Sequence, residues 1–206
     1  LAECKIKSFL LPGASSIFKA YSHAFNATHP EDDDIIIMCH DDITIREKPN
    51  VFVEKLKATI QKENTGFIGP AGTEDLGSDA VWWDQSRWAL NKHHGKVSHL
   101  DPNGKEYETM YGKPSKVVVL DGLFLASTAK VIKDVGLEKP AYFKGEWDFY
   151  DIHYTSSAFL KGYYNRILDI NILHNSRGEL VGRESWHNNR EAFIKNTKLP
   201  LRLKNE

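Results

Sequence analysis

The most apolar stretches of the chain are two runs of β-branched residues that end on carboxylates. Residues 35–43 begin with three consecutive isoleucines and close on His40, Asp41 and Asp42, and a second run carries valines up to Asp121. Short apolar runs bounded by polar turns are typical of strands that helices cover on both faces of a parallel sheet. The pattern therefore predicts two buried strands that deliver acidic side chains to one edge of the sheet.

Helical and shorter extended segments alternate around these strands. Apolar residues recur at helical spacing over residues 17–26, 49–62, 127–135 and 147–160. Further strands are predicted over residues 5–11, 65–72 and 163–173, and a hairpin that projects from the main sheet over residues 96–108. This alternation predicts an α/β fold, with a central, mostly parallel mixed β-sheet flanked by helices and a small β-hairpin added.

The length and the charge of the chain limit its organisation and its partners. A chain of 206 residues is expected to form one domain, residues 1–206, in which residues 177–206 form a mobile loop and a terminal helix that can close over an anionic ligand. Lys and Arg number 27 against 28 Asp and Glu, so no overall positive field favours nucleic acid or an anionic membrane surface. Any phosphate of a ligand must therefore be bound locally.

Cysteine usage and hydropathy favour a cytoplasmic protein. The two cysteines, Cys4 and Cys39, form neither a disulfide framework nor a zinc-site pattern, and Cys39 lies within a predicted core strand. No stretch approaches the roughly 18 consecutive apolar residues of a membrane span, and residues 1–5 lack the apolar core of a signal peptide. We expect a soluble chain in a reducing compartment.

Polar side chains that suit a metal ion follow the apolar runs. His40, Asp41 and Asp42 combine an imidazole with two carboxylates and favour a divalent cation such as magnesium or manganese, because hard cations prefer oxygen ligands. His174 follows the last predicted strand in the same way, and Asp121 brings another acid to that edge. The ordinary alternatives are a polar strand end that caps the next turn and a histidine with a structural role.

Three further features each have two explanations. Asp148 and Asp151 lie three apart in a predicted helix and share a face, yet acidic residues at a helix start commonly stabilise the helix dipole. Trp82, Trp83 and Trp88 can form platforms for sugar or base rings, although paired tryptophans more often pack in a core. The small-residue turn before the first helix can accept a phosphate or approach a base.

The order of these signals resembles the GT-A nucleotide-sugar glycosyltransferases, most closely their streptomycin-biosynthesis glycosyltransferase-like branch. His40-Asp41-Asp42 resembles the family's Asp-x-Asp motif in a His-x-Asp form. The other matching segments are residues 67–72, Trp82-Trp83, 119–126, the helix 150–153 with Gly162-Tyr163 downstream, and 174–178 as His-x-Ser-x-Gly. The match covers about residues 16–190, and the chain is also similar to viral glycosyltransferases that build capsid-protein glycans.

The resemblance implies an enzyme that moves a hexose-type sugar from a UDP-sugar donor to a glycan or glycoprotein acceptor, and a chain that can belong to a longer polypeptide. It implies Mn²⁺ or Mg²⁺ held by Asp42 and His174 with Asp41. It also implies Asp151 as the base that takes the acceptor proton, with Asp121 beside the sugar. The nucleotide contacts that it implies are Leu11, Pro12, Gly13, Ser16, His40, Asp41, Arg177 and Arg183.

Two motif positions depart from the family pattern. His40 stands where the family has its first Asp, and Tyr150 stands where it has the Glu of Glu-Asp, which puts the metal geometry and the base assignment in question. The front of the chain is short as well, because only residues 5–13 precede the first helix and leave little chain for base-recognition strands. Inverting and retaining transfer both stay open.

Two other functions stay open at this point. A His-Asp pair such as His40-Asp41 also occurs in metal-dependent phosphohydrolases, although those enzymes carry such pairs on helices and this pair ends a predicted strand. The tryptophans and the two substituted motif positions also suit a sugar-nucleotide or glycan-binding module without transfer activity.

Overall fold

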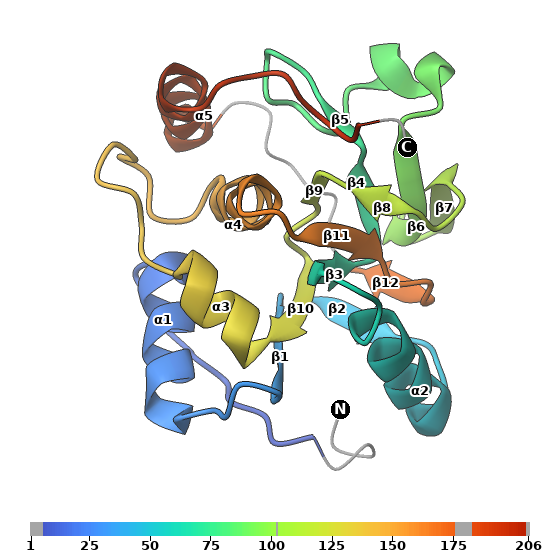
Figure 1. Ribbon diagram of the computed structural model, residues 1–206. Helices are drawn as coiled ribbons and strands as arrows, with labels where there is room; N and C mark the ends of the chain where they lie inside the picture. The colour runs from blue at the N-terminus through green and yellow to red at the C-terminus, as the bar shows by residue number, and fades with distance from the viewer. Residues whose placement is uncertain (1–5, 102, 176–182, 205–206) are drawn as a thin grey trace.

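The computed structural model describes residues 6–101, 103–175 and 183–204, which form an α/β fold (Figure 1). The α-helices of the described residues are α1 (Ile17–Thr28), α2 (Pro49–Ile60), α3 (Ala129–Val135), α4 (Tyr150–Leu160) and α5 (Glu184–Asn196). In Figure 1, α2 lies on one side of the central strands, and α3 and α4 lie on the other. The predicted α/β class and the alternation of helices with strands are confirmed.

Two mixed sheets form the centre of the described residues. The first has the order β1 (Ile35–Cys39), β10 (Phe124–Thr128), β3 (Thr65–Gly69), β11 (Tyr164–Ile167) and β8 (Lys116–Val117). The second has the order β2 (Ile43–Ile45), β12 (Ile172–His174), β6 (His93–Leu100), β4 (Ala71–Thr73) and β9 (Val119–Leu120), with β7 (Glu106–Gly112) paired to β6. A small separate pair joins β5 (Asp75–Leu76) to β13 (Leu201–Arg202).

The prediction of a mostly parallel sheet was wrong. The parallel pairings among the described strands are β3 with β11 and β6 with β12, and the other recorded pairings are antiparallel. The isoleucines of β1 are partly exposed rather than fully buried, because β1 ends the first sheet and pairs only with the antiparallel β10 among the described strands. A continuous apolar run is typical of parallel sheets, but it does not fix the direction of the neighbouring strand.

Two predicted single strands are each divided between the sheets. The run that ends at Asp121 forms β8 in the first sheet and β9 in the second, and Val118 between them donates its N–H to Thr73 at 2.8 Å. The last predicted strand forms β11 in the first sheet and β12 in the second. Each segment therefore carries the chain from one sheet to the other, which a continuous apolar pattern does not reveal.

The front of the chain and the hairpin also differ from expectation. Residues 6–11 form no strand, and Phe9 and Leu10 expose 54% and 77% of their surface. The hairpin around the Asn103-Gly104 turn is present as β6 and β7, but β6 pairs with β4 and β12 and is part of the second sheet. A hairpin pattern predicts the two strands and the turn, and the further partners of β6 come from distant segments.

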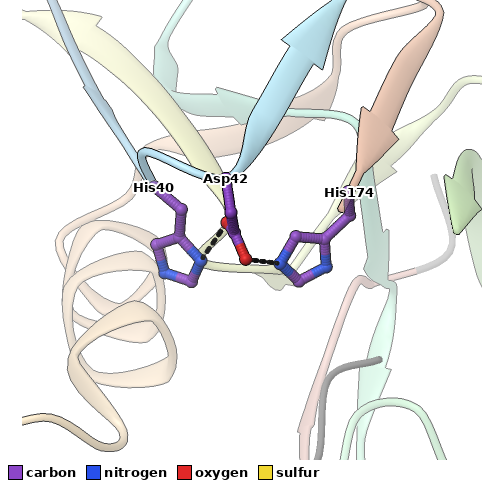
Figure 2. A group of neighbouring side chains, drawn as sticks. All are labelled: His40, Asp42 and His174. Carbon is purple, nitrogen blue, oxygen red and sulfur yellow. Dashed lines mark ion pairs between the residues drawn. The ribbon is translucent and has the colours of Figure 1, made fainter. Parts of the chain in front are cut away.

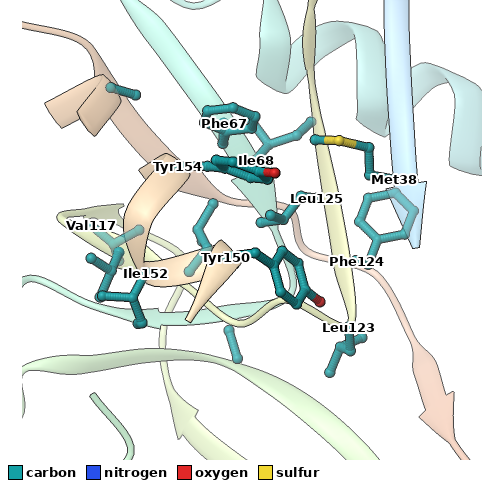
Figure 3. Close-up of a cluster of buried hydrophobic side chains, with 14 of the residues drawn as sticks. Met38, Phe67, Ile68, Val117, Leu123, Phe124, Leu125, Tyr150, Ile152 and Tyr154 are labelled. Atoms are coloured by element: carbon teal, nitrogen blue, oxygen red, sulfur yellow. The ribbon is translucent and has the colours of Figure 1, made fainter. Parts of the chain in front are cut away.

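Local sequence signals explain where the helices begin and end. Ser16 caps α1, because its Oγ accepts a hydrogen bond from the N–H of Lys19 at 3.3 Å. Thr128 caps α3 in the same way, and Gly136 ends that helix at a φ of 82°. Figure 3 shows part of the core, where Phe67, Leu125 and other buried apolar residues of the strands meet the side chains of α4.

Candidate functional site

Three polar side chains from different strand ends converge at the junction of the two sheets (Figure 2). His40 follows β1, Asp42 precedes β2, and His174 ends β12, which pairs with β2. Nδ1 of His40 lies 3.9 Å from Oδ1 of Asp42, and Nε2 of His174 lies 3.4 Å from Oδ2 of the same carboxylate. One candidate ligand atom from each residue lies within 4.8 Å of the others.

This cluster fits a divalent cation. Oδ1 of Asp42 is buried and makes no hydrogen bond among the described residues, which leaves a charged oxygen without the partner that buried polar atoms normally have. A cation between this oxygen and the two imidazoles would supply that partner. The carboxylate suits manganese or magnesium, and imidazoles are ligands of divalent transition metals. Burial lowers the pKa of His40 and so favours the neutral imidazole that a metal requires.

Asp41 is not a member of this cluster. The clustered group contains His40 instead, and Asp41 is an exposed residue that lines the neighbouring cleft. The predicted ligands Asp42 and His174 are therefore brought together, and the predicted metal contact of Asp41 stays a prediction.

Asp121, Gly122 and Asp151 line the same cleft. Oδ2 of Asp151 accepts a hydrogen bond from the N–H of Gly122 at 3.1 Å, and Oδ1 of Asp121 accepts one from the N–H of Leu123 at 3.0 Å. Burial, and next the negative charge of Asp121, raise the pKa of Asp151 to about 7. Asp151 can therefore take up or release a proton near neutral pH, as a general base must.

The sequence predicted that Asp148 and Asp151 share a helical face. This prediction was wrong. Phe149 precedes α4 with a φ of 69°, so the helix begins only at Tyr150 and Asp148 lies before it. Asp148 is buried and accepts a hydrogen bond from the hydroxyl of Ser185 on α5 at 2.5 Å. Its carboxylate therefore links α5 to the segment before α4.

A large cleft, about 1490 Å³ in volume, adjoins the cluster. Some of the predicted nucleotide contacts line this cleft and others do not. Leu11, Pro12 and Gly13 line it, whereas Ser16 is buried and caps α1. Arg183 also lines it, with its Nη1 3.8 Å from Oδ1 of Asp148. Arg177 lies outside the described residues.

Residues 2–195 match the model of a family described as glycosyltransferase-like. The chain belongs to the glycosyltransferase-like family. No curated protein matches the chain in sequence.

The fold of this glycosyltransferase-like chain is similar to that of a solved GT-A glycosyltransferase. The crystal structure of GalNAc-T7 with UDP, GalNAc and Mn²⁺ is similar with a TM-score of 0.54 at 12% identity. The match covers 86% of this chain and 33% of that one, so the chain spans about a third of the length of GalNAc-T7. Among the described residues, no helix combines the length and the apolar character that crossing a membrane requires.

The clustered tryptophans of this glycosyltransferase-like chain pack in the core and also line the cleft. Trp82 is buried, and its ring contacts those of Trp83 and Tyr111, which is core packing. All three clustered tryptophans also line the cleft, where Trp88 exposes 36% of its surface. Packing therefore fixes the rings beside the cleft, and a platform role for them stays a prediction.

Two residues at the site were not among the predicted contacts. Tyr150 lies 2.8 Å from Nε2 of His40 through its hydroxyl, and His99 of β6 lies in register with His174 of β12. The parallel register of β6 and β12 brings the two imidazoles together, with ring centroids 5.9 Å apart. No local signal predicts either contact, because each depends on the pairing of segments that are distant in the sequence.

Proposed function

We propose that this chain is a divalent-metal-dependent glycosyltransferase that moves a hexose-type sugar from a UDP-sugar to a glycan or glycoprotein acceptor. The observation that carries the proposal is the cluster of His40, Asp42 and His174 beside the large cleft of a glycosyltransferase-like chain. The presence of UDP and Mn²⁺ in the structurally similar GalNAc-T7 supports the choice of nucleotide and metal.

The proposed donor side binds the nucleotide diphosphate. His40, Asp42 and His174 would hold Mn²⁺ or Mg²⁺, which when bound neutralises charge on the diphosphate. Asp41 contacts the ribose or completes the metal shell. The turn at Leu11, Pro12 and Gly13 approaches the nucleoside.

Positive side chains complete the donor side of the proposal. Arg183, whose side chain is 58% exposed, turns from Asp148 towards phosphate oxygens, which guanidinium groups bind in a forked arrangement. Arg177 is proposed as a second phosphate contact, and Ser16 positions the start of α1 beneath the donor.

The proposed acceptor side moves one proton. In an inverting transfer, the acceptor hydroxyl oxygen bonds to the anomeric carbon, the bond from that carbon to the diphosphate breaks, and Asp151 takes the hydroxyl proton. The raised pKa of Asp151, about 7, supports this assignment because the carboxylate is basic enough to accept a proton and is ionised at slightly alkaline pH. Asp121 lies beside the sugar and is the next candidate for the base.

The order of motifs supports membership of the streptomycin-biosynthesis glycosyltransferase-like branch and makes capsid-type glycoproteins one acceptor class to test. Residues 1–206 are proposed to act as one domain, alone or within a longer polypeptide. The cysteine pattern of the sequence supports a reducing compartment, the cytoplasm, or the host cytoplasm for a viral protein.

The test is a thermal-shift panel of UDP, GDP, CMP and ADP with and without Mn²⁺. UDP should raise the melting temperature only when Mn²⁺ or Mg²⁺ is present, because a ligand that binds the folded state stabilises it by mass action. Asp42→Ala should abolish the shift. Asp169→Ala, an exposed aspartate after β11, is the matched control and should keep it.

Product analysis with a radiolabelled UDP-sugar separates the competing functions. Transfer of label to a glycan acceptor supports the enzyme, and a UDP shift without turnover would favour a binding module. Phosphate release from simple esters would favour a hydrolase, against which the placement of His40-Asp41 after a strand already argues. An equal UDP shift without metal would contradict the proposal.

A further inference from the structure

Tyr150 combines a fixed core position with a polar contact to the candidate metal site. It is the first residue of α4 and exposes only 5% of its surface, and its ring packs edge-on against Phe18 at a centroid distance of 6.4 Å. Figure 3 shows the ring among buried apolar residues with the hydroxyl at its far end. The packing therefore fixes where the hydroxyl lies.

The hydroxyl of Tyr150 donates its proton to a backbone carbonyl. It lies 2.9 Å from the carbonyl oxygen of Gly122, which can only accept a hydrogen bond, so Tyr150 donates its single proton there. Gly122 is buried, and loss of this donor would leave its carbonyl without that partner. The close approach also needs glycine, because an added Cβ would lie 2.3 Å from the hydroxyl oxygen.

The other contact of the Tyr150 hydroxyl determines which ring nitrogen of His40 carries the proton. Nε2 of His40 lies 2.8 Å from the Tyr150 oxygen, and a hydroxyl whose proton is used can only accept. His40 must therefore donate from Nε2. The ring of Tyr21 also packs edge-on against that of Tyr150, with centroids 5.9 Å apart, and the conclusion is the same if the proton of Tyr150 points to Tyr21 instead.

A neutral imidazole that carries its proton on Nε2 has a lone pair on Nδ1. Nδ1 of His40 lies 3.9 Å from Oδ1 of Asp42, the buried oxygen without a hydrogen bond among the described residues (Figure 2). Without a cation, the lone pairs of Nδ1 and Oδ1 repel one another across this gap. A cation between them would bind both atoms. The unpaired carboxylate oxygen is thus explained together with the histidine.

We propose that Tyr150 is a positioning residue that holds His40 in the tautomer whose Nδ1 binds the divalent cation. The inference deepens the proposed function and rests on the metal site that it names. A purely structural Tyr150 would only satisfy the carbonyl of Gly122 and fill the core, with no effect on the proton of His40.

The first test compares Tyr150→Phe with Tyr154→Phe in Mn²⁺ titrations. Tyr154 lies one turn along α4, is fully buried and donates its hydroxyl to the carbonyl of Leu137 at 2.7 Å, so its replacement removes a similar hydrogen bond away from the site. Loss of a group that orients a metal-ligating histidine typically lowers metal affinity about 10–100-fold. Tyr150→Phe should lose that much Mn²⁺ affinity while Tyr154→Phe keeps the wild-type value. Equal affinities in the two variants would overturn the inference.

The second test reads the tautomer directly in metal-free protein. In ¹⁵N-histidine spectra above pH 7, His40 should carry its proton on Nε2 in the wild type and Tyr154→Phe. Tyr150→Phe should give a mixture or the Nδ1-protonated form. Circular dichroism checks that each variant is folded. Wild-type protein that binds no Mn²⁺ would defeat the proposed metal site, whereas a wild-type His40 protonated on Nδ1 would defeat this inference alone.

Discussion

At the scale of single residues, the environment of Asp151 has a consequence for stability that does not depend on catalysis. Its carboxyl is partly buried beside Asp121, and these two effects raise its pKa from 3.8 to about 7. Between these values the folded protein keeps a proton that the unfolded chain releases. Stability therefore falls as pH rises from about 4 to 7.

Asp151→Asn should remove this pH dependence, because an amide does not ionise. A shift of this size corresponds to at most about 4 kcal/mol, and the partial exposure of Asp151 reduces it. Urea unfolding with EDTA at pH 5 and pH 8 measures the effect. The wild type should lose more free energy of unfolding between these values than the variant does.

The same variant tests the proposed catalytic role. Loss of a general base lowers the rate by about 10²–10⁴-fold, and the Mn²⁺-dependent UDP shift should persist. Asp148→Asn is not a suitable control because Asp148 is buried against Ser185. If Asp151→Asn transfers sugar at the wild-type rate, the base lies elsewhere, with Asp121 the next residue to test.

At the scale of elements, the second sheet depends on a close approach between β6 and the turn that joins β3 to β4. Gly95 of β6 has a φ of +92°, and a Cβ added there would lie 1.9 Å from the carbonyl oxygen of Pro70. Gly162, after α4, has the same φ and no atom within 4 Å of an added Cβ. The pair therefore separates backbone strain from crowding.

Gly162→Ala should cost only the strain of a left-handed alanine, about 1–2 kcal/mol. Gly95→Ala should add the cost of crowding against backbone, about 1–3 kcal/mol more. Free energies of unfolding from urea titrations measure the difference. Equal losses in the two variants would mean that the β3–β4 turn moves away from β6 without cost.

Local sequence signals predicted the helices, the hairpin turn and the three clustered side chains as candidates for a metal ion. Ser16 and Gly136 are cap and stop residues whose effects reach only a few positions, so the start of α1 and the end of α3 followed from the pattern. Asp42 and His174 were recognisable because each adjoins a strand end. The contact between His40 and Tyr150 was not, because it joins residues 110 positions apart and depends on how α4 packs. The direction of strand pairing was missed for the same reason.

At the scale of the whole molecule, the candidate site lies where the two sheets are joined. The chain crosses between the sheets from β8 to β9 and from β11 to β12, and the clustered residues come from the ends of strands in both sheets. Asn165 of β11 secures one crossing, because its Nδ2 donates to the carbonyls of Val118 at 2.7 Å and Thr155 at 2.8 Å. Its Oδ1 accepts the N–H of Phe67 at 2.9 Å.

The two sheets are therefore expected to unfold together, as one domain. Calorimetry of the metal-free chain should show one transition whose calorimetric and van't Hoff enthalpies agree. Asn165→Ala leaves three buried backbone groups without these partners and should lower the free energy of unfolding by at least about 2 kcal/mol, which lowers the melting temperature of the single transition by several degrees. Asn50→Ala, at an exposed position of α2, should change it by no more than about 0.5 kcal/mol. Two resolved transitions, or an Asn165→Ala effect confined to one of them, would show that the sheets are separate units. The cluster would then join two bodies that move relative to each other, and Mn²⁺ would be expected to merge the transitions.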